Sequence, residues 1–377
     1  MKIGILTYHK SINYGSVLQV WSMYNKLIKE GYEVEVIDYE PKQYCEMYGN
    51  KEKKIVKKII FHIIYKALKK QTYLFEEFRN NYLSLSKEKY YYDSDFDSIG
   101  KEYDDVICGS DQIWNVYAKD CDPIYFLPFS VKGKKIAYAP SVNIMTFKEE
   151  RYGKELKKWM LDFDYISCRE KTGATKIFNY LDRQKEVETV LDPTFFNESK
   201  DLLKMSSERL IKGDYIFLYY ADFYGHTDYL METIKEIKKA TNMPVYTILM
   251  TKSVRQIMEL KRNGIRIKMS KSSPNDFLSF IRHAKFVVTN SFHGTAISLI
   301  MKKQFVAIND IYDDGTHKDD ERIKNILSEF NLLDRMIKKS DLNSFDLCTE
   351  IDYEKIDCIR RDKARKSFEW LKNAIEE

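Results

Sequence analysis

The segment Lys285–Gln304 constrains the fold more than any other part of the sequence. It opens with Phe286–Thr289, an apolar and β-branched run that predicts a buried strand of a parallel sheet. It closes with Thr295–Met301, whose apolar spacing and small residues predict a helix packed on that sheet. A strand followed directly by a helix is the unit of a doubly wound α/β sheet, which binds its ligands at the carboxyl ends of strands.

The turn between this strand and this helix carries the candidate chemistry. It contains Asn290, Ser291, Phe292, His293 and Gly294. The free N–H groups and the positive dipole end of the following helix favour an anion here, and a histidine can donate a proton to it. Taken alone, the segment also fits an ordinary turn in which Ser291 caps the helix and His293 has no chemical role.

The same alternation of strands and helices runs through two successive halves of the chain. The predicted strands are Lys2–Thr7, Glu33–Asp38, Asp104–Cys108, Lys135–Ala139, Asp164–Cys168, Val187–Leu191, Asp214–Tyr220, Val245–Leu249, Phe286–Thr289 and Phe305–Ile308. The predicted helices are Ser16–Lys29, Lys171–Tyr180, His226–Ala240, Asn275–His283, Thr295–Met301, Asp320–Phe330 and Tyr353–Glu377.

This pattern predicts an α/β protein with two Rossmann-like domains facing a cleft. The N-terminal domain spans residues 1–197 and the C-terminal domain spans residues 214–345. A polar linker over 198–213 joins them, and residues 346–377 form a closing helix.

The loops after the early strands offer further ligand contacts. Asn13, Tyr14 and Gly15 fit a tight turn that brings the backbone close to a ligand, although a plain loop fits equally well. The G-x-G-x-x-G fingerprint is missing from this first unit, so a dinucleotide is not indicated.

The loop after Asp104–Cys108 has the composition of a sugar-binding site. Ser110, Asp111 and Gln112 could hold hydroxyl groups, and Trp114 could stack on a sugar face. The competing interpretation is a capped turn with Trp114 in the core.

Arg169 stands at the end of the strand Asp164–Cys168. A guanidinium at a strand end suits bidentate capture of a carboxylate or phosphate. The alternative is a solvated surface pair between Arg169 and Glu170.

Residues 51–70 combine eight lysines with an apolar helical stripe inside a predicted excursion over residues 51–83. Such a helix could lie on an anionic membrane surface. The favoured interpretation is that it packs on its own domain through the apolar stripe and leaves the lysines in water.

Composition excludes several other classes of protein. The 62 basic and 57 acidic residues are interleaved and give a net charge of only +5, which does not indicate a nucleic-acid partner. The six cysteines form no C-x-x-C pair, so reduced thiols are expected rather than zinc ligands or disulfides. No apolar run is long enough to cross a bilayer, and the first strand begins at Lys2, which leaves no room for a signal peptide. We therefore expect a cytoplasmic protein.

Seven motifs in order, from Ile3 to about Arg335, resemble the polysaccharide pyruvyl transferase family. They are TYHKSINYGSVLQ, VIDYEP, GSDQIWN, SCRE, LDPTFF, TNSFHGTAISLI and RIKNILSEFNLLDR. The resemblance implies a fold like that of the B-type glycosyltransferases. It also implies transfer of the pyruvyl group of phosphoenolpyruvate to two hydroxyls of a sugar as a cyclic ketal. The expected co-substrate is phosphoenolpyruvate, without a metal or cofactor.

By this resemblance, His293 matches the motif histidine of the family and Arg169 its donor-binding arginine. Some members carry an arginine where this chain has Ser291, and an aspartate where it has Ser16. Donor binding would then rest on Arg169 and on the start of the helix. The expected donor-side residues are Arg169, Ser291, Gly294, Thr295 and Arg322, with Lys302 as a further cation.

Asp111 is the expected acceptor-activating base. The acceptor would be a sugar, a sugar nucleotide or a lipid-linked saccharide of a surface polysaccharide. The protein could also contact the inner face of the membrane peripherally. Two alternatives remain: a glycosyltransferase using a nucleotide sugar, and a non-catalytic carbohydrate-binding member of polysaccharide assembly.

Overall fold

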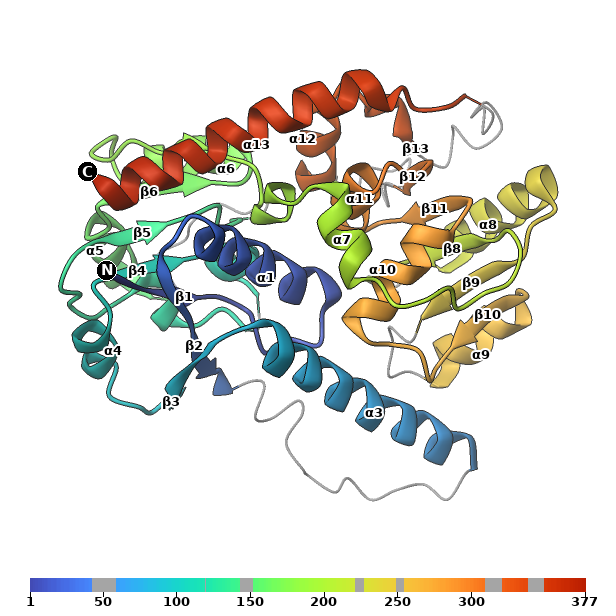
Figure 1. The fold of residues 1–377 in the computed structure, drawn as a ribbon, viewed down its shortest axis with the longest axis horizontal. Helices are drawn as coiled ribbons and strands as arrows, with labels where there is room; N and C mark the ends of the chain where they lie inside the picture. The colour runs from blue at the N-terminus through green and yellow to red at the C-terminus, as the bar shows by residue number, and fades with distance from the viewer. Residues whose placement is uncertain are drawn as a thin grey trace. The chain divides into compact units, whose positions relative to one another are not determined.

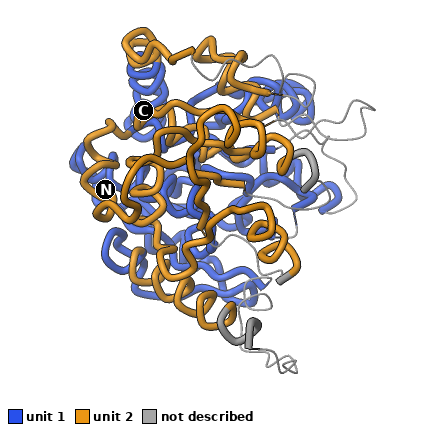
Figure 2. Tube along the Cα trace, turned by 90° about the vertical axis from the view of Figure 1, so that its right-hand side faces the viewer, with its two compact units in different colours: residues 1–52, 79–196, 360–377 blue, residues 53–78, 197–359 orange. Residues whose placement is uncertain are grey.

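The computed structural model describes residues 1–42, 59–118, 120–142, 152–220, 227–248, 254–308, 321–337 and 349–377. The chain forms two compact units, which Figure 2 distinguishes by colour. Unit 1 comprises Met1–Glu52, Arg79–Phe196 and Arg360–Glu377, and unit 2 comprises Lys53–Phe78 and Asn197–Ile359. Each unit is described by itself.

Unit 1 is built on a parallel sheet (Figure 1). Over the described residues the sheet has seven strands in the order β3-β2-β1-β4-β5-β6-β7. The strands are β1 (Lys2–Leu6), β2 (Glu33–Glu40), β3 (Leu85–Tyr91), β4 (Asp105–Cys108), β5 (Lys135–Ala137), β6 (Tyr165–Cys168) and β7 (Glu188–Thr189). The helices that belong wholly to this unit are α1 (Tyr14–Lys29), α4 (Asp97–Glu102), α5 (Gly153–Leu161) and α6 (Lys171–Tyr180).

Strand order reverses between β1 and β4. The chain runs outward from β1 through β2 to β3, then returns to pair β4 with the other side of β1. The middle strands β4 and β5 are buried along their whole length, as expected for a parallel sheet covered on both faces. The predicted strand Val187–Leu191 is mostly irregular, because only Glu188 and Thr189 pair with β6.

Unit 2 repeats this plan. Its sheet has six strands over the described residues, in the order β10-β9-β8-β11-β12-β13, and the order reverses between β8 and β11. The strands are β8 (Ile216–Tyr219), β9 (Val245–Ile248), β10 (Ile265–Lys268), β11 (Phe286–Thr289), β12 (Phe305–Ile308) and β13 (Met336–Ile337). The helices are α7 (Ser199–Met205), α8 (Thr227–Thr241), α9 (Val254–Arg262), α10 (Pro274–His283), α11 (Phe292–Ile300) and α12 (Glu321–Glu329). The predicted α/β class with two parallel sheets is therefore confirmed.

The polar segment predicted as a linker contains the helix α7. Asp201 accepts a hydrogen bond from the backbone N–H of Glu198 at 2.9 Å, which fixes the first turn. Asn275 of α10 donates a side-chain hydrogen bond to the carbonyl of Met205 at the end of α7. The polar composition therefore reflects a capped helix held against unit 2.

Two long helices, α3 (Ile59–Tyr82) and α13 (Tyr353–Glu376), each have residues in both units. In unit 2, Ile64 and Ala67 of α3 form an apolar cluster with Ile257 of α9. The exposed positions beside them include Lys66, Lys69 and Lys70. The described part of the apolar stripe is thus buried, but it packs on α9 of unit 2 and not on the N-terminal domain to which the excursion was assigned. The side chains of residues 51–63 lie outside the described part.

Helix α13 contributes to the core of unit 1 through its C-terminal half. The Ser367 hydroxyl accepts a hydrogen bond from the backbone N–H of Leu191, and Trp370 packs on Tyr138. Among the helices of the described ranges, none combines the length and apolarity needed to cross a bilayer.

Candidate functional site

The carboxyl ends of β1 and β4 meet at the point where the strand order of unit 1 reverses. Ligands of doubly wound sheets bind at such a point. The loop Tyr8–Asn13 follows β1 and the loop Gly109–Asp111 follows β4. Both loops were singled out in the sequence, and the structure brings them together.

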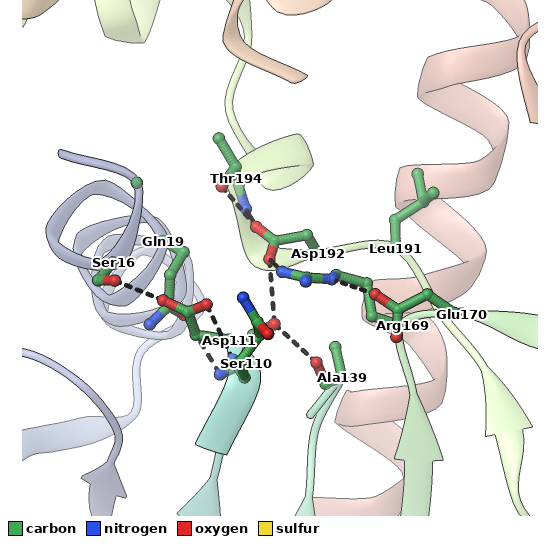
Figure 3. Close-up of polar contacts among 12 residues, drawn as sticks. Ser16, Gln19, Ser110, Asp111, Ala139, Arg169, Glu170, Leu191, Asp192 and Thr194 are labelled. Atoms are coloured by element: carbon green, nitrogen blue, oxygen red, sulfur yellow. Dashed lines mark hydrogen bonds and ion pairs between the residues drawn. The ribbon is translucent and has the colours of Figure 1, made fainter. Parts of the chain in front are cut away.

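Asp111 lies at the centre of this edge. Its Oδ2 accepts a hydrogen bond from the Ser16 hydroxyl at 2.5 Å, and its Oδ1 accepts one from the Gln112 N–H at 2.8 Å (Figure 3). Its backbone has φ of 77°, a conformation that costs a non-glycine residue about 1–3 kcal/mol. Ser141 holds it there by donating its backbone N–H to the Asp111 carbonyl at 2.8 Å.

Ser110 holds the same loop through several buried hydrogen bonds. Its backbone carbonyl accepts a bond from the Thr7 hydroxyl, and its N–H donates to the Gln19 side chain. Gln19 in turn donates to the Thr7 hydroxyl at 3.0 Å. The Ser110 hydroxyl donates to the Ala139 carbonyl at 2.7 Å and contacts Asp192 at 3.0 Å. Ser110 is fully buried and its hydrogen bonds hold the loop, and its predicted role as an acceptor contact stays a prediction.

Arg169 is enclosed by carboxylates. Its Nε pairs with Glu170 at 2.9 Å and its Nη1 with Asp192 at 3.1 Å, and only 2% of its side chain is exposed (Figure 3). Burial alone would lower the pKa of Arg169, but Glu170, Asp192 and Asp111 raise it above its ordinary value. The Arg169–Glu170 pair is therefore buried, not the solvated surface pair of the alternative interpretation. A donor anion at Arg169 would have to share the guanidinium with two carboxylates, and its donor-binding role stays a prediction.

Asp192 joins this network and was missed as a site residue in the sequence. Its Oδ2 contacts Ser110 and Arg169, and its Oδ1 accepts bonds from the Thr194 N–H at 2.9 Å and hydroxyl at 2.5 Å. The carboxylate is completely buried. An aspartate directly after the predicted strand Val187–Leu191 was the available signal, because it stands at a strand end like Asp111 and Arg169.

Trp114 does not stack on a sugar. Its ring is fully buried, stacks on Phe126 at 5.5 Å between ring centroids, and donates its indole N–H to the Tyr125 carbonyl. The aromatic residues of the following turn recruit it into the core, as the competing interpretation held. The neighbouring Gln112 remains partly exposed.

The predicted turn Asn13–Gly15 begins α1. Asn13 caps the helix, since its side chain accepts hydrogen bonds from the Gly15 and Ser16 N–H groups at 2.9 and 3.4 Å. Tyr14 and Gly15 are buried, whereas Asn13 is exposed. Of the three predicted acceptor contacts in this turn, Asn13 alone is on the surface.

A buried histidine next to this edge was also missed. His9 follows β1, and its Nε2 lies 3.1 Å from Asp38 at the end of β2. Lys10 pairs with the same carboxylate at 2.9 Å. Burial lowers the pKa of His9, although its contact with Asp38 opposes the shift. Burial would raise the pKa of Asp38, but His9 and Lys10 hold it well below its usual range.

In unit 2, β8 and β11 meet at the corresponding reversal point, and α11 begins there. Ser291 caps α11, accepting a hydrogen bond from the Gly294 N–H at 3.3 Å. The helix begins at Phe292, so His293 lies in its first turn and not in the turn before it. His293 is 7% exposed, and its ring contacts that of Phe292 edge-on.

The first turn of α11 packs tightly on the sheet. A Cβ on Gly294 would lie 2.3 Å from Thr289 Oγ1 and 2.8 Å from Tyr219 Cδ1. The Thr295 N–H and hydroxyl both donate to the Ser291 carbonyl. Gly294 and Thr295 therefore donate hydrogen bonds to the cap residue Ser291, and their predicted contacts with phosphoenolpyruvate stay predictions.

The two predicted cations of unit 2 have different positions. Arg322 is half-buried in the first turn of α12, a helix that packs against α11. Lys302 lies beyond the far end of α11 and pairs with Asp357 of α13 at 2.5 Å. Because α11 spans nine residues, about 13 Å of helix separates Lys302 from the start of α11, and its part in donor binding stays a prediction.

The solved structures that resemble the chain have B-type glycosyltransferase architecture. One is an alpha-glucosyltransferase in complex with UDP and DNA, with 10% sequence identity, a TM-score of 0.53 and coverage of 100% of both chains. Another is a putative UDP-N-acetylglucosamine 2-epimerase from Listeria monocytogenes, with 12% identity, a TM-score of 0.50 and coverage of 94% of this chain and 90% of that chain. These likenesses concern the fold alone and confirm the predicted architecture.

No curated protein sequence matches the chain significantly. The family model described as polysaccharide pyruvyl transferase, however, matches residues 13–310. This range contains β4 of unit 1, with Asp111 and Arg169 in the segments that follow β4 and β6, and it contains β8, β11 and His293 of unit 2. Since the match covers well over half of the sequence, this chain belongs to the polysaccharide pyruvyl transferase family.

Proposed function

We propose that the chain transfers the pyruvyl group of phosphoenolpyruvate to two hydroxyls of a sugar in a surface-polysaccharide precursor. The observation that carries the proposal is the position of His293. It lies in the first turn of α11, directly after β11, inside the part of the chain that the family model matches. A proton donor beside a helix N-terminus suits a donor that carries both a phosphate and a carboxylate.

The reaction begins with transfer of a proton from His293 to the methylene carbon of phosphoenolpyruvate. The methylene becomes a methyl group, and the neighbouring carbon becomes electrophilic. A sugar hydroxyl attacks that carbon and gives its proton to the carboxylate of Asp111, which also accepts a hydrogen bond from the Ser16 hydroxyl. The bond between that carbon and the phosphate oxygen then breaks, and the electron pair leaves with the phosphate. The second sugar hydroxyl forms its bond to the same carbon and gives its proton to the departing phosphate.

The donor-side residues in this proposal are Ser291 and Arg322 of unit 2 together with Arg169 of unit 1. Ser291 sets the start of α11, and Arg322 is half-buried at the start of α12. The acceptor-side residues are Asn13 and Gln112, the exposed and partly exposed polar side chains near Asp111. The acceptor is a sugar, a sugar nucleotide or a lipid-linked saccharide, and nothing in this scheme requires a metal.

The test is phosphate release from phosphoenolpyruvate with a panel of sugar acceptors, and mass spectrometry identifies an acceptor that has gained a pyruvyl ketal. His293→Gln should lower turnover about 10²–10⁴-fold, because glutamine forms hydrogen bonds but supplies no acidic proton. Donor affinity, measured by calorimetry with phosphoenolpyruvate, should change little.

His283→Gln is the matched control, because His283 is the last residue of α10 and precedes the amino end of β11. It should retain the turnover of the wild type. Wild-type turnover in His293→Gln would exclude the acid role. A wild type that is inactive across the panel but turns over nucleotide sugars would identify a glycosyltransferase instead.

A further inference from the structure

The carboxyl edge of unit 1 contains a residue in a strained conformation at the place where the proposed base stands. Asp111 combines a φ of 77° with near-complete burial. A non-glycine residue keeps such a conformation only where its surroundings over-determine it. The residues that hold Asp111 are therefore part of the machinery of the site.

The contacts of Asp111 itself are local. They come from Ser16, Gln112 and Ser141. None of the three fixes the residue before it, Ser110, whose position sets the direction in which the chain enters Asp111.

Ser110 is held by Thr7, Gln19 and Ala139, and its hydroxyl also contacts Asp192. The carboxylate of Asp192 contacts the Ser110 hydroxyl at 3.0 Å and the Arg169 guanidinium at 3.1 Å through the same oxygen. Its other oxygen accepts two bonds from Thr194. One buried carboxylate thus joins the segments that follow β4, β6 and β7 (Figure 3).

The charges favour this arrangement. Two carboxylates, Glu170 and Asp192, flank the one guanidinium of Arg169, which compensates for their burial. The backbone N–H of Arg169 also donates a hydrogen bond to the Pro140 carbonyl, and Pro140 pairs with Asp111 in an isolated β-bridge. Asp192 is therefore linked to the Asp111 loop in two ways, through Ser110 and through Arg169.

We propose that Asp192 is the positioning residue of this site: through Ser110 and Arg169 it keeps Asp111 in the orientation that receives the proton of the acceptor hydroxyl. The part of this inference that concerns catalysis rests on the proposed pyruvyl transfer. The part that concerns the loop does not, and the two are measured separately.

The central variant is Asp192→Asn. It keeps the shape of the side chain but only one accepting oxygen, so it cannot accept hydrogen bonds from both Arg169 and Thr194. Asp105→Asn is the matched control: Asp105 is also a buried aspartate of unit 1 and accepts a backbone N–H from Lys134, but it begins β4, at the opposite end from Asp111. Thr194→Val is a milder second variant that removes only the hydroxyl donor to Asp192.

The first measurement is amide hydrogen exchange of the peptide that contains Gln112, with the melting temperature recorded in parallel. Asp192→Asn should speed exchange there about tenfold or more, and Thr194→Val should do so to a smaller extent. Asp105→Asn should leave this peptide unchanged. If exchange in the Asp192→Asn variant matches the wild type, Asp192 does not hold the loop and the inference is wrong.

The second measurement is a double-mutant cycle in the pyruvyl-transfer assay. Asp192→Asn should lower kcat about 10²-fold without raising the KM for phosphoenolpyruvate, and added to Asp111→Asn it should cause little further loss. With His293→Gln the losses should multiply. Independent losses with Asp111→Asn would overturn the positioning role. Inactivity of the wild type would refute the proposed function, and the exchange measurement would still decide whether Asp192 holds the loop.

Discussion

The two sheets share the same reversal of strand order, but different kinds of groups surround the reversal point in each sheet. In unit 1, the reversal point between β1 and β4 is surrounded by buried polar side chains, including Asp111, Arg169 and Asp192. In unit 2, the point between β8 and β11 is formed by the backbone start of α11, with His293 as the titratable residue of its first turn.

The difference shows two ways to fix a reactive group. Unit 1 holds Asp111 by bonds between side chains, so its geometry depends on a network that must stay complete. Unit 2 holds His293 by close packing of a helix on a strand, with Gly294 beside Thr289. Changes of side-chain chemistry should therefore disturb unit 1 most, and changes of volume should disturb unit 2 most.

Arg169→Lys should show the largest loss of stability. One ammonium cannot reproduce the separate contacts of Nε with Glu170 and of Nη1 with Asp192, so a buried carboxylate loses its partner. We expect the free energy of unfolding to fall by about 3 kcal/mol in urea titrations. Arg365→Lys, at an exposed position of α13, is the control and should leave the urea midpoint unchanged. An unchanged midpoint in Arg169→Lys would remove the contrast between the units, and an unchanged affinity for phosphoenolpyruvate would exclude Arg169 from donor binding.

Gly294→Ala tests the packing of unit 2. The added methyl group would lie 2.3 Å from Thr289 Oγ1, so the strand or the helix must shift. We expect a loss of about 1–2 kcal/mol in the free energy of unfolding, with faster exchange of the amides of α11. Adding Thr289→Ala should make the combined loss smaller than the sum of the single losses. Additive losses would mean that this contact does not limit the volume at residue 294.

The dependence of stability on pH should be the smallest of these effects and should appear in unit 1. Burial lowers the pKa of His9, so the folded chain binds fewer protons than the unfolded chain. The stabilisation is complete above the ordinary histidine value of 6.5 and is lost as the pH falls below it, by at most about 1.4 kcal/mol per pH unit.

Amide exchange of β1 and β2 at pH 7.5 and pH 5.5, corrected for the intrinsic rates, measures this loss. Asp38, Lys10 and Arg79 are the charged groups that act on His9. His9→Gln should make the difference between the two pH values smaller. His283→Gln is the comparison in unit 2, where burial also lowers the pKa of a histidine, and it should leave β1 and β2 unaffected. A slope that persists in His9→Gln would assign the effect to another group.

The sequence predicted the helices and strands better than it predicted the contacts between them. The apolar runs at 286–289 and 305–308 are strands with those bounds, because buried parallel strands are short and continuously apolar. The start of α11 was placed at Thr295, since Ser291 and Gly294 resemble a turn. In the structure the Ser291 cap already begins the helix at Phe292.

The hydrogen bonds and ion pairs of unit 1 could largely not be predicted from the sequence. Asp192 meets Ser110 across 82 positions of sequence, and it does so because the order β4-β5-β6-β7 places four strand ends next to one another. That order follows from tertiary packing. Trp114 was assigned to a ligand for a related reason: its local motif is polar, whereas its actual neighbours, such as Phe163, come from distant segments.

The buried thiols of unit 1 can report local opening of the structure through the rate at which a thiol reagent labels them. Cys108, Cys121 and Cys168 are free and buried in that unit, whereas Cys358 is exposed. Among the cysteines that the structure describes, a maleimide reagent should therefore modify Cys358 at once, and Cys108, Cys121 and Cys168 only when the surrounding elements open. The labelling order of Cys108 in β4 and Cys168 in β6 would record, on the unaltered protein, which part of that sheet opens first.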